Sequence, residues 1–280
     1  MPVLQNKIDF AVVIRVKHAN PNGDPLNGNR PRTDYNNYGE ITDVCLKRKI
    51  RDRLQENGHA IFVQSDDRKN DDARSLRERA EKTLGNKFGG TETAKLACEK
   101  WIDVRAFGQL FALPKKNKSK NAEEEGNAGI SIPIRGPVSI HSAFSVQPVE
   151  VTSTQITKSV SGEGDGNKRG SDTMGMKHRV DDGVYVFYGS MNPQLAEKTG
   201  FNDEDAEAIK QVLPKLFEND ASSARPEGSM EVLKVVWWNH TCKSGQYSSA
   251  KVHRSLAVKQ NGEIEVARLD GLQPDVVDGF

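Results

Sequence analysis

The chain has 280 residues, of which 35% are hydrophobic and 6% aromatic, and its 40 basic and 39 acidic residues leave a formal net charge of +1. Such a balanced charge neither favours nor excludes binding to nucleic acid, because that binding depends on how the charges are distributed over the surface. Its three cysteines are scattered and form no C-x-x-C pair, which excludes a disulfide scaffold and a cysteine-rich zinc site. The sequence has no long apolar run and no signal-like start, which predicts a cytoplasmic protein without a membrane span.

The first predicted element is a buried strand over 8–16, which is rich in β-branched residues. The segment 18–40 follows, rich in asparagine, glycine and proline and without apolar periodicity, which is typical of a functional loop. Asn20 and Asn22 are candidates for contacting RNA. The alternative is that the Asn-Pro and Asn-Gly pairs only form tight turns.

A helix is predicted from Thr42 or Asp43 as N-cap to about residue 57, with Leu46, Ile50 and Leu54 forming one buried stripe. Five cations fall within seven residues of this helix: Lys47, Arg48, Lys49, Arg51 and Arg53. Helical geometry places two of them on each flank of the stripe and directs Arg48 away from it. RNA phosphates are one partner for these cations, and the alternative is a solvated helix face.

Between 59 and 113 the sequence predicts a short apolar strand at 60–63 and two helices, one charged at 74–84 and one at 92–102. Arg105 follows as a further candidate RNA contact. Residues 114–129 have low complexity and segregated charges, which predicts a flexible insertion.

Strand patterns resume at 130, and Arg135, beside Gly136 and Pro137, could hold a phosphate or belong to an ordinary turn. Residues 151–191 are predicted to form a long hairpin with a mobile end. Its candidate RNA-binding residues are Met174, Lys177, His178 and Arg179, since a methionine can wedge against a base while cations hold the backbone. A disordered tip on an ordinary hairpin is the alternative.

A helix at 203–218, interrupted by Pro214, and a strand at 230–241 follow, with one of Trp237 and Trp238 expected in the core and the other at an interface. Weak strands are expected in the remaining tail. The order of strands and helices predicts an α+β sandwich of the ferredoxin-like type, the architecture to which the RNA-recognition module (RRM) belongs.

Several motifs in order along the chain resemble the crRNA-binding backbone subunit of type I-C CRISPR-associated Cascade complexes, in the RAMP superfamily. They read NPNGDPLNGNRPRTD at 20–34, ITDVCLKRKIRDRL at 41–54, DVRAFG at 103–108, IRGPVSIHSAFSVQPV at 134–149, TMGMKHRVDDGVYV at 173–186 and LAEKTGFNDED at 195–205. The combination is specific, although each piece alone is weak. The lysine- and glutamate-rich insertion at 115–129 and a short tail depart from the family pattern.

The resemblance implies a single RAMP-type domain over 1–280, with a modified RRM/ferredoxin-like palm and a protruding β-hairpin thumb at about 151–182. Helical residues at 59–100 and flexible residues at 114–129 would be insertions. Copies would stack head to tail along crRNA, beside the large subunit and the guide-processing subunit, and a target DNA strand would pair with the exposed guide. The resemblance implies no enzymatic activity, no metal and no cofactor.

Three other functions are compatible with the sequence. Asp24 or Asp34 could cut RNA as the loop aspartate of a RAMP endonuclease. His178 could act as general base in a guide-processing ribonuclease. The chain could also be a generic RNA chaperone, which would bind RNA without forming ordered arrays.

Overall fold

The computed structural model describes residues 2–113, 130–157 and 174–280, so the predicted insertion at 114–129 and the hairpin tip at 158–173 lie outside the described residues. One antiparallel sheet forms the centre of the fold, in the order β14-β11-β1-β10-β8-β4, with β7 and β9 also paired to β10. Its strands are β1 (Ile8–Ala19), β4 (Tyr38–Ile41), β7 (Val138–Ile140), β8 (Ala143–Pro148), β9 (Val151–Thr157), β10 (Met174–Met191), β11 (Met230–Asn239) and β14 (Pro274–Asp278).

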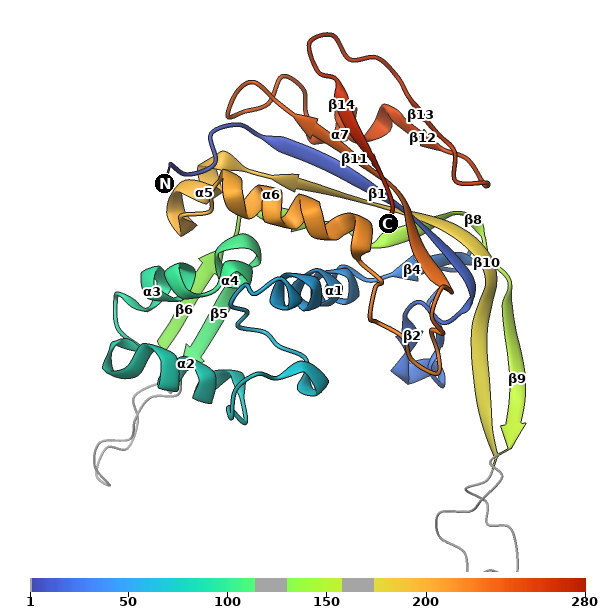
Figure 1. Ribbon diagram of the computed structural model, residues 1–280, viewed down its shortest axis with the longest axis horizontal. Helices are drawn as coiled ribbons and strands as arrows, with labels where there is room; N and C mark the ends of the chain where they lie inside the picture. Colours follow the sequence, from blue (N-terminus) through green and yellow to red (C-terminus); the bar gives the residue numbers. More distant parts are fainter. Residues whose placement is uncertain (1, 114–129, 158–173) are drawn as a thin grey trace, which may run out of the picture.

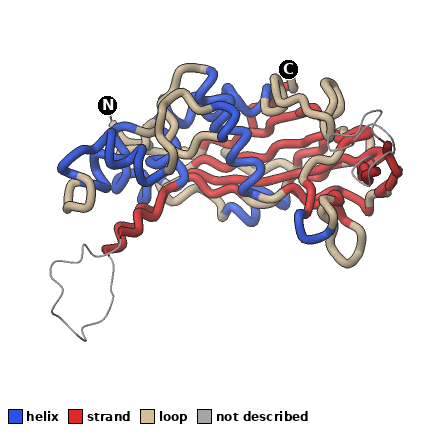
Figure 2. The backbone as a smooth tube through the Cα atoms, turned by 90° about the horizontal axis from the view of Figure 1, so that it is seen from below, coloured by secondary structure: helices blue, strands red, loops and turns tan. Residues whose placement is uncertain are grey.

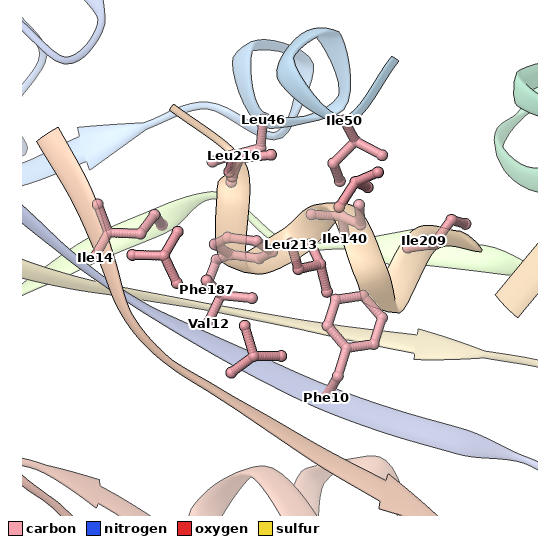
Figure 3. Packing of buried hydrophobic residues seen from close by; sticks show 14 of the residues in the cluster. Phe10, Val12, Ile14, Leu46, Ile50, Ile140, Phe187, Ile209, Leu213 and Leu216 are labelled. Atoms are coloured by element: carbon pink, nitrogen blue, oxygen red, sulfur yellow. The ribbon is translucent and has the colours of Figure 1, made fainter. Parts of the chain in front are cut away.

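Two helices, α1 (Asp43–Glu56) and α6 (Asp203–Val212), cover one face of this sheet (Figure 1). Seen from below, helices cross the long strands on this side (Figure 2). The predicted stripe of α1 is confirmed, because Leu46, Ile50 and Leu54 are all fully buried in the main core. Figure 3 shows Leu46 and Ile50 of α1 approaching Leu213 and Leu216 above the strands.

The helix ends follow local chemistry. Thr42 caps α1, since its Oγ1 accepts a hydrogen bond from the Cys45 N–H at 3.3 Å. A capping box between Asn202 and Asp205 starts α6. The prediction that this helix runs to 218 is wrong: α6 ends at Val212, and a short 3-10 turn over Leu213–Lys215 follows, because Pro214 cannot donate the next helical hydrogen bond. Helix α5 (Pro193–Thr199) was not predicted.

The C-terminal segment covers the other face of the sheet, with α7 (Ser249–Arg254), β12 (Leu256–Val258) and β13 (Ile264–Val266). Trp238 lies in this second core and Trp237 in the first, and their exposed fractions are 0% and 2%. The expectation that one tryptophan faces an interface is therefore wrong, because the chain's own tail covers that face.

A smaller lobe has its own core around Phe62, Trp101 and Phe111. It contains α2 (Leu76–Leu84), α3 (Thr93–Lys100), α4 (Ile102–Phe107), β5 (Gly108–Leu113) and β6 (Ile130–Arg135). The charged helix is confirmed, whereas the single helix at 92–102 is split because Trp101 is extended. The strand predicted at 60–63 is wrong, since these residues have irregular backbone with a bend at 62–63.

Candidate nucleic-acid interface

The asparagine-rich segment folds back on itself through β2 (Gly23–Asp24) and β3 (Arg30–Pro31) and packs against the start of α1. Asn22 fixes this arrangement, because its Oδ1 accepts hydrogen bonds from both the backbone N–H and the hydroxyl of Thr42, at 2.9 Å each. Asn20 is 4% exposed and donates to the Asn29 carbonyl at 2.7 Å. Both asparagines therefore have a structural role in the loop, and their contact with RNA stays a prediction that the burial of Asn20 does not favour.

Lys49 is the clearest correction on the basic helix. Its side chain is 2% exposed, and its ammonium pairs with Asp220 and lies 5.7 Å from the centre of the Phe217 ring. Burial lowers the pKa of Lys49, and the carboxylate of Asp220 opposes that shift. Its neighbour on the same flank, Arg53, is also buried and donates to the Glu218 carbonyl. This flank of α1 therefore anchors the 217–220 segment and is closed to RNA.

Arg51 and Arg105, on the side of the smaller lobe, also have protein partners. Arg51 Nε lies 3.0 Å from Asp103, whose two carboxylate oxygens also accept the N–H groups of Phe62 and Val63 at 2.7 and 3.0 Å. Arg105 forms a two-pronged pair with Asp205 of α6 at 2.7 and 2.6 Å. Asp103 and Arg105 of the DVRAFG motif thus connect the smaller lobe to the helices that cover the sheet, through ion pairs with Arg51 of α1 and Asp205 of α6.

Lys47 and Arg48 remain at the surface of α1. Lys47 pairs with Asp43 at 2.9 Å one helical turn away, and Arg48 donates to the Ser65 hydroxyl at 3.0 Å. Arg48 keeps 44% of its side chain exposed, and its pair with Asp52 is at 3.5 Å. The Lys47–Asp43 pair is partly exposed and therefore weak, and Arg48 keeps free guanidinium surface although its partner Asp52 is buried, so both cations stay available to an anionic partner.

The hairpin of β9 and β10 extends away from the sheet beside the asparagine-rich segment (Figure 1). Alternate residues of a strand point to opposite faces, so Met174, Met176 and His178 share one face and Lys177 and Arg179 share the other. The two methionines are 66% and 56% exposed. The methionines and the cations Lys177 and Arg179 therefore lie on opposite sides of the same ribbon, so they cannot meet the same face of a bound strand.

A junction between loop and hairpin was missed in the sequence. Arg30 Nη1 donates to Ser153 Oγ at 2.8 Å, and the same oxygen lies 2.8 Å from His178 Nδ1. The face of Met174, Met176 and His178 is thus the face turned toward the asparagine-rich segment. The signal in the sequence was weak: Arg30 is one of two arginines in GNRPR, and no periodic pattern distinguishes it from Arg32.

Arg135 is exposed at the end of β6, and its contact with RNA stays a prediction. Its position depends on a close backbone approach, since a Cβ on Gly136 would lie 2.2 Å from the Ala106 carbonyl oxygen, and one on Gly108 would lie 2.3 Å from that of Ile134. Both motifs, DVRAFG and IRGP, therefore contribute to one backbone contact beneath Arg135.

The two loop aspartates cap turns. Asp24 accepts the Leu26 N–H at 3.2 Å and lies 3.4 Å from Arg32, and one oxygen of Asp34 accepts the N–H groups of Asn36 and Tyr38 at 2.8 and 2.9 Å. Across residues 2–113, 130–157 and 174–280, no three acidic, histidine or cysteine side chains gather as a metal would require. None of the helices in these same ranges has the length and apolar character needed to cross a bilayer.

Comparison with known proteins gives the following matches. The family model "CRISPR-associated protein Cas7" matches residues 6–271. A "CRISPR-associated protein Cas7" from Haloferax volcanii is 28% identical over 244 residues, which are 82% of this chain and 69% of that protein. A chain of a solved structure titled "CRISPR RNA-guided surveillance complex, pre-nicking" matches with a TM-score of 0.48 and 14% identity, over 83% of this chain and 78% of that chain. A chain of a second structure, titled "CRISPR RNA-guided surveillance complex", matches with a TM-score of 0.45 and 17% identity, over 92% of this chain and 77% of that chain.

Proposed function

Because this chain belongs to the CRISPR-associated protein Cas7 family, we propose that it is a crRNA-binding backbone subunit of a CRISPR surveillance complex. The observation that carries the proposal is the family match, which runs nearly from end to end of the chain. In this role the protein binds and does not cut. Its partners are crRNA, further copies of itself, a target DNA strand paired to the guide, and the large and guide-processing subunits of a Cascade of type I-C.

The sheet supports an RRM/ferredoxin-like palm in this proposal. Four strands run antiparallel in the order β11-β1-β10-β8, and α1 and α6, which follow the first and third of these strands in the chain, both lie on one face. That is the arrangement of a βαββαβ fold with insertions. The hairpin of β9 and β10 then corresponds to the thumb.

The exposed face of the hairpin supports a sequence-independent mode of RNA binding. Met174 and Met176 present flexible apolar side chains that can pack against a displaced base. Arg48 of α1 and Arg135 of β6 supply exposed positive charge for phosphates, and the half-buried Lys47 of α1 adds a third cation. Reading of sequence is left to base pairing with the guide.

The test is to measure the mass of the purified protein by light scattering with and without a CRISPR guide RNA, and then to run the RNA on a denaturing gel. We expect particles whose mass grows with guide length, intact RNA, and an affinity that falls steeply with salt as counterions are released. A monomer that leaves the RNA unbound would refute the proposal. Cleaved RNA, abolished by Asp24→Ala or Asp34→Ala, would instead support the endonuclease.

A further inference from the structure

We propose that Arg30, Ser153 and His178 form a binding site for one phosphodiester group of single-stranded RNA at the root of the hairpin. The proposal rests on the proposed function, since it assigns a specific contact within the same surface. Its basis is the meeting of three separate chain segments, β3, β9 and β10, at a single hydroxyl group.

The first argument is the uncompensated charge of Arg30. Arg32, its neighbour two residues away, lies 3.4 Å from Asp24. Arg30 instead donates to the neutral Ser153 hydroxyl, and no carboxylate of the described residues lies within ion-pair distance of its guanidinium. A half-buried guanidinium gains most from an anion that accepts its remaining N–H groups, and phosphate matches its planar geometry.

The second argument is the direction of the hydrogen bonds around Ser153. Arginine can only donate, so Ser153 Oγ accepts from Arg30 and its own proton is free to point at His178 Nδ1. With Nδ1 as acceptor, the other ring nitrogen of His178, Nε2, carries a proton. The site therefore presents two donors, the free N–H groups of Arg30 and the Nε2–H of His178, to the two non-bridging oxygens of a phosphate. Ser153 acts as the positioning residue.

The third argument is the location of the site relative to the methionines. His178 shares its face of β10 with Met176 and Met174. Each step of two residues along a strand covers about 7 Å. A phosphate held at His178 thus places the attached nucleoside beside Met176, where an exposed thioether side chain meets it. The site fixes the backbone of the RNA and leaves its bases free.

The test compares Arg30→Gln, Arg30→Lys and Ser153→Ala with Arg74→Gln, a matched control. Arg74 is exposed before α2; its backbone N–H donates to Glu78, but its guanidinium, like that of Arg30, forms no ion pair with a carboxylate of the described residues. Affinity is measured by fluorescence anisotropy over a salt series, on an RNA short enough to bind one copy. A thermal melt of each variant confirms that it is folded.

We expect Arg30→Gln to weaken binding about tenfold and to reduce the slope of log K against log salt by about 0.7, the value for one phosphate of a single strand. Arg30→Lys keeps the slope but loses about threefold in affinity, because lysine lacks the planar fork. Ser153→Ala weakens binding about threefold at unchanged slope, as a positioning residue should. Arg74→Gln changes neither quantity.

A scan with one neutral methylphosphonate at each position of the RNA locates the contact. Neutralising one particular phosphate should lower the affinity of the wild-type protein more than neutralising any other. The same substitution should not lower the affinity of Arg30→Gln, because this variant already lacks the arginine that contacts that phosphate. If wild-type protein binds RNA but Arg30→Gln behaves like Arg74→Gln, this site is refuted while the proposed function stands. If Arg30→Gln spares single-copy binding but prevents assembly of copies, the partner is a protein carboxylate and the site is also refuted. If wild-type protein binds no RNA at all, the proposed function itself fails.

Discussion

Helix α1 and the junction between loop and hairpin both combine cations with polar side chains, and they use them differently. In α1, Lys49 is buried and paired with Asp220, Arg53 is buried and bonded to the Glu218 carbonyl and to Glu56, and Arg51 is paired with Asp103. At the junction, Arg30 is only half-buried and meets a neutral hydroxyl. The helix has far more charge along the sequence, whereas the junction has the charge that is left without a counterion.

The difference teaches that charge density is a poor guide to nucleic-acid contacts when acidic residues are equally abundant. A chain with 40 basic and 39 acidic side chains can neutralise most of its own cations. What remains for an anionic ligand is decided by which pairs the fold completes. The following predictions test the contrast, from the largest expected effect to the smallest.

Asp220→Ala should be the most damaging change. It leaves the buried ammonium of Lys49 without its counterion, and breaking a buried pair costs about 3–5 kcal/mol. The free energy of unfolding is measured with urea. The control, Asp43→Ala, removes the exposed partner of Lys47 and should cost less than about 1 kcal/mol. Equal losses would show that the two flanks of α1 do not differ.

Asp103→Ala should destabilise by about 3 kcal/mol, because it leaves the N–H groups of Phe62 and Val63 and the guanidinium of Arg51 without their acceptor. The matched control is Asp72→Ala, at an exposed position of the same lobe. Urea unfolding again provides the measurement. A loss no greater than that of the control would mean that Arg51 is free to serve RNA after all.

The third prediction concerns acid stability and Asp9, a buried carboxylate of β1. Burial raises its pKa, but hydrogen bonds from His240 and Ser249 and the charge of Lys7 outweigh burial and lower the pKa below its ordinary value. The stabilisation is therefore fully present above about pH 4 and is lost as the pH falls through the folded pKa. Asp9→Asn should cost about 2 kcal/mol at neutral pH and flatten the loss of stability in acid, measured by urea unfolding at several pH values.

If Asp9→Asn loses stability in acid as steeply as the wild-type protein, the acid sensitivity belongs to other groups. His253, which lies 3.6 Å from Asp9, also makes the free energy of unfolding fall as the pH falls. Its pKa is lowered chiefly by burial, so its contribution is present in the neutral form and declines as the pH falls below its ordinary value of about 6.5.

The smallest effect on stability is expected for the exposed face of the hairpin. Replacing Met174 and Met176 together by alanine should change the free energy of unfolding by less than about 0.5 kcal/mol. RNA affinity should fall by about fivefold, because two apolar contacts to bases are lost. Ile156→Ala, on the opposite face of the ribbon, is the control and should leave affinity unchanged. Equal effects of the two faces would refute the assignment of RNA binding to the face of Met174 and Met176.

Local patterns in the sequence determined a large part of this fold. The apolar runs placed β1 and β11, the spacing of Leu46, Ile50 and Leu54 gave α1 and its buried side, and alternation indicated the hairpin. These signals depend on neighbours within a few residues, which is the range over which periodicity and capping act. For the same reason the family motifs could be recognised in order along the chain.

Only the tertiary structure decided how the charges and the second face of the sheet are used. The partners of Lys49 and Arg105 lie 171 and 100 residues away along the chain, so no local pattern could assign them. Trp238 is buried by a tail that is itself weakly patterned, and Arg30 meets Ser153 across 123 residues. Periodicity reports which side of an element is apolar, whereas pairing between distant side chains depends on the positions of whole elements, which only the assembled fold fixes.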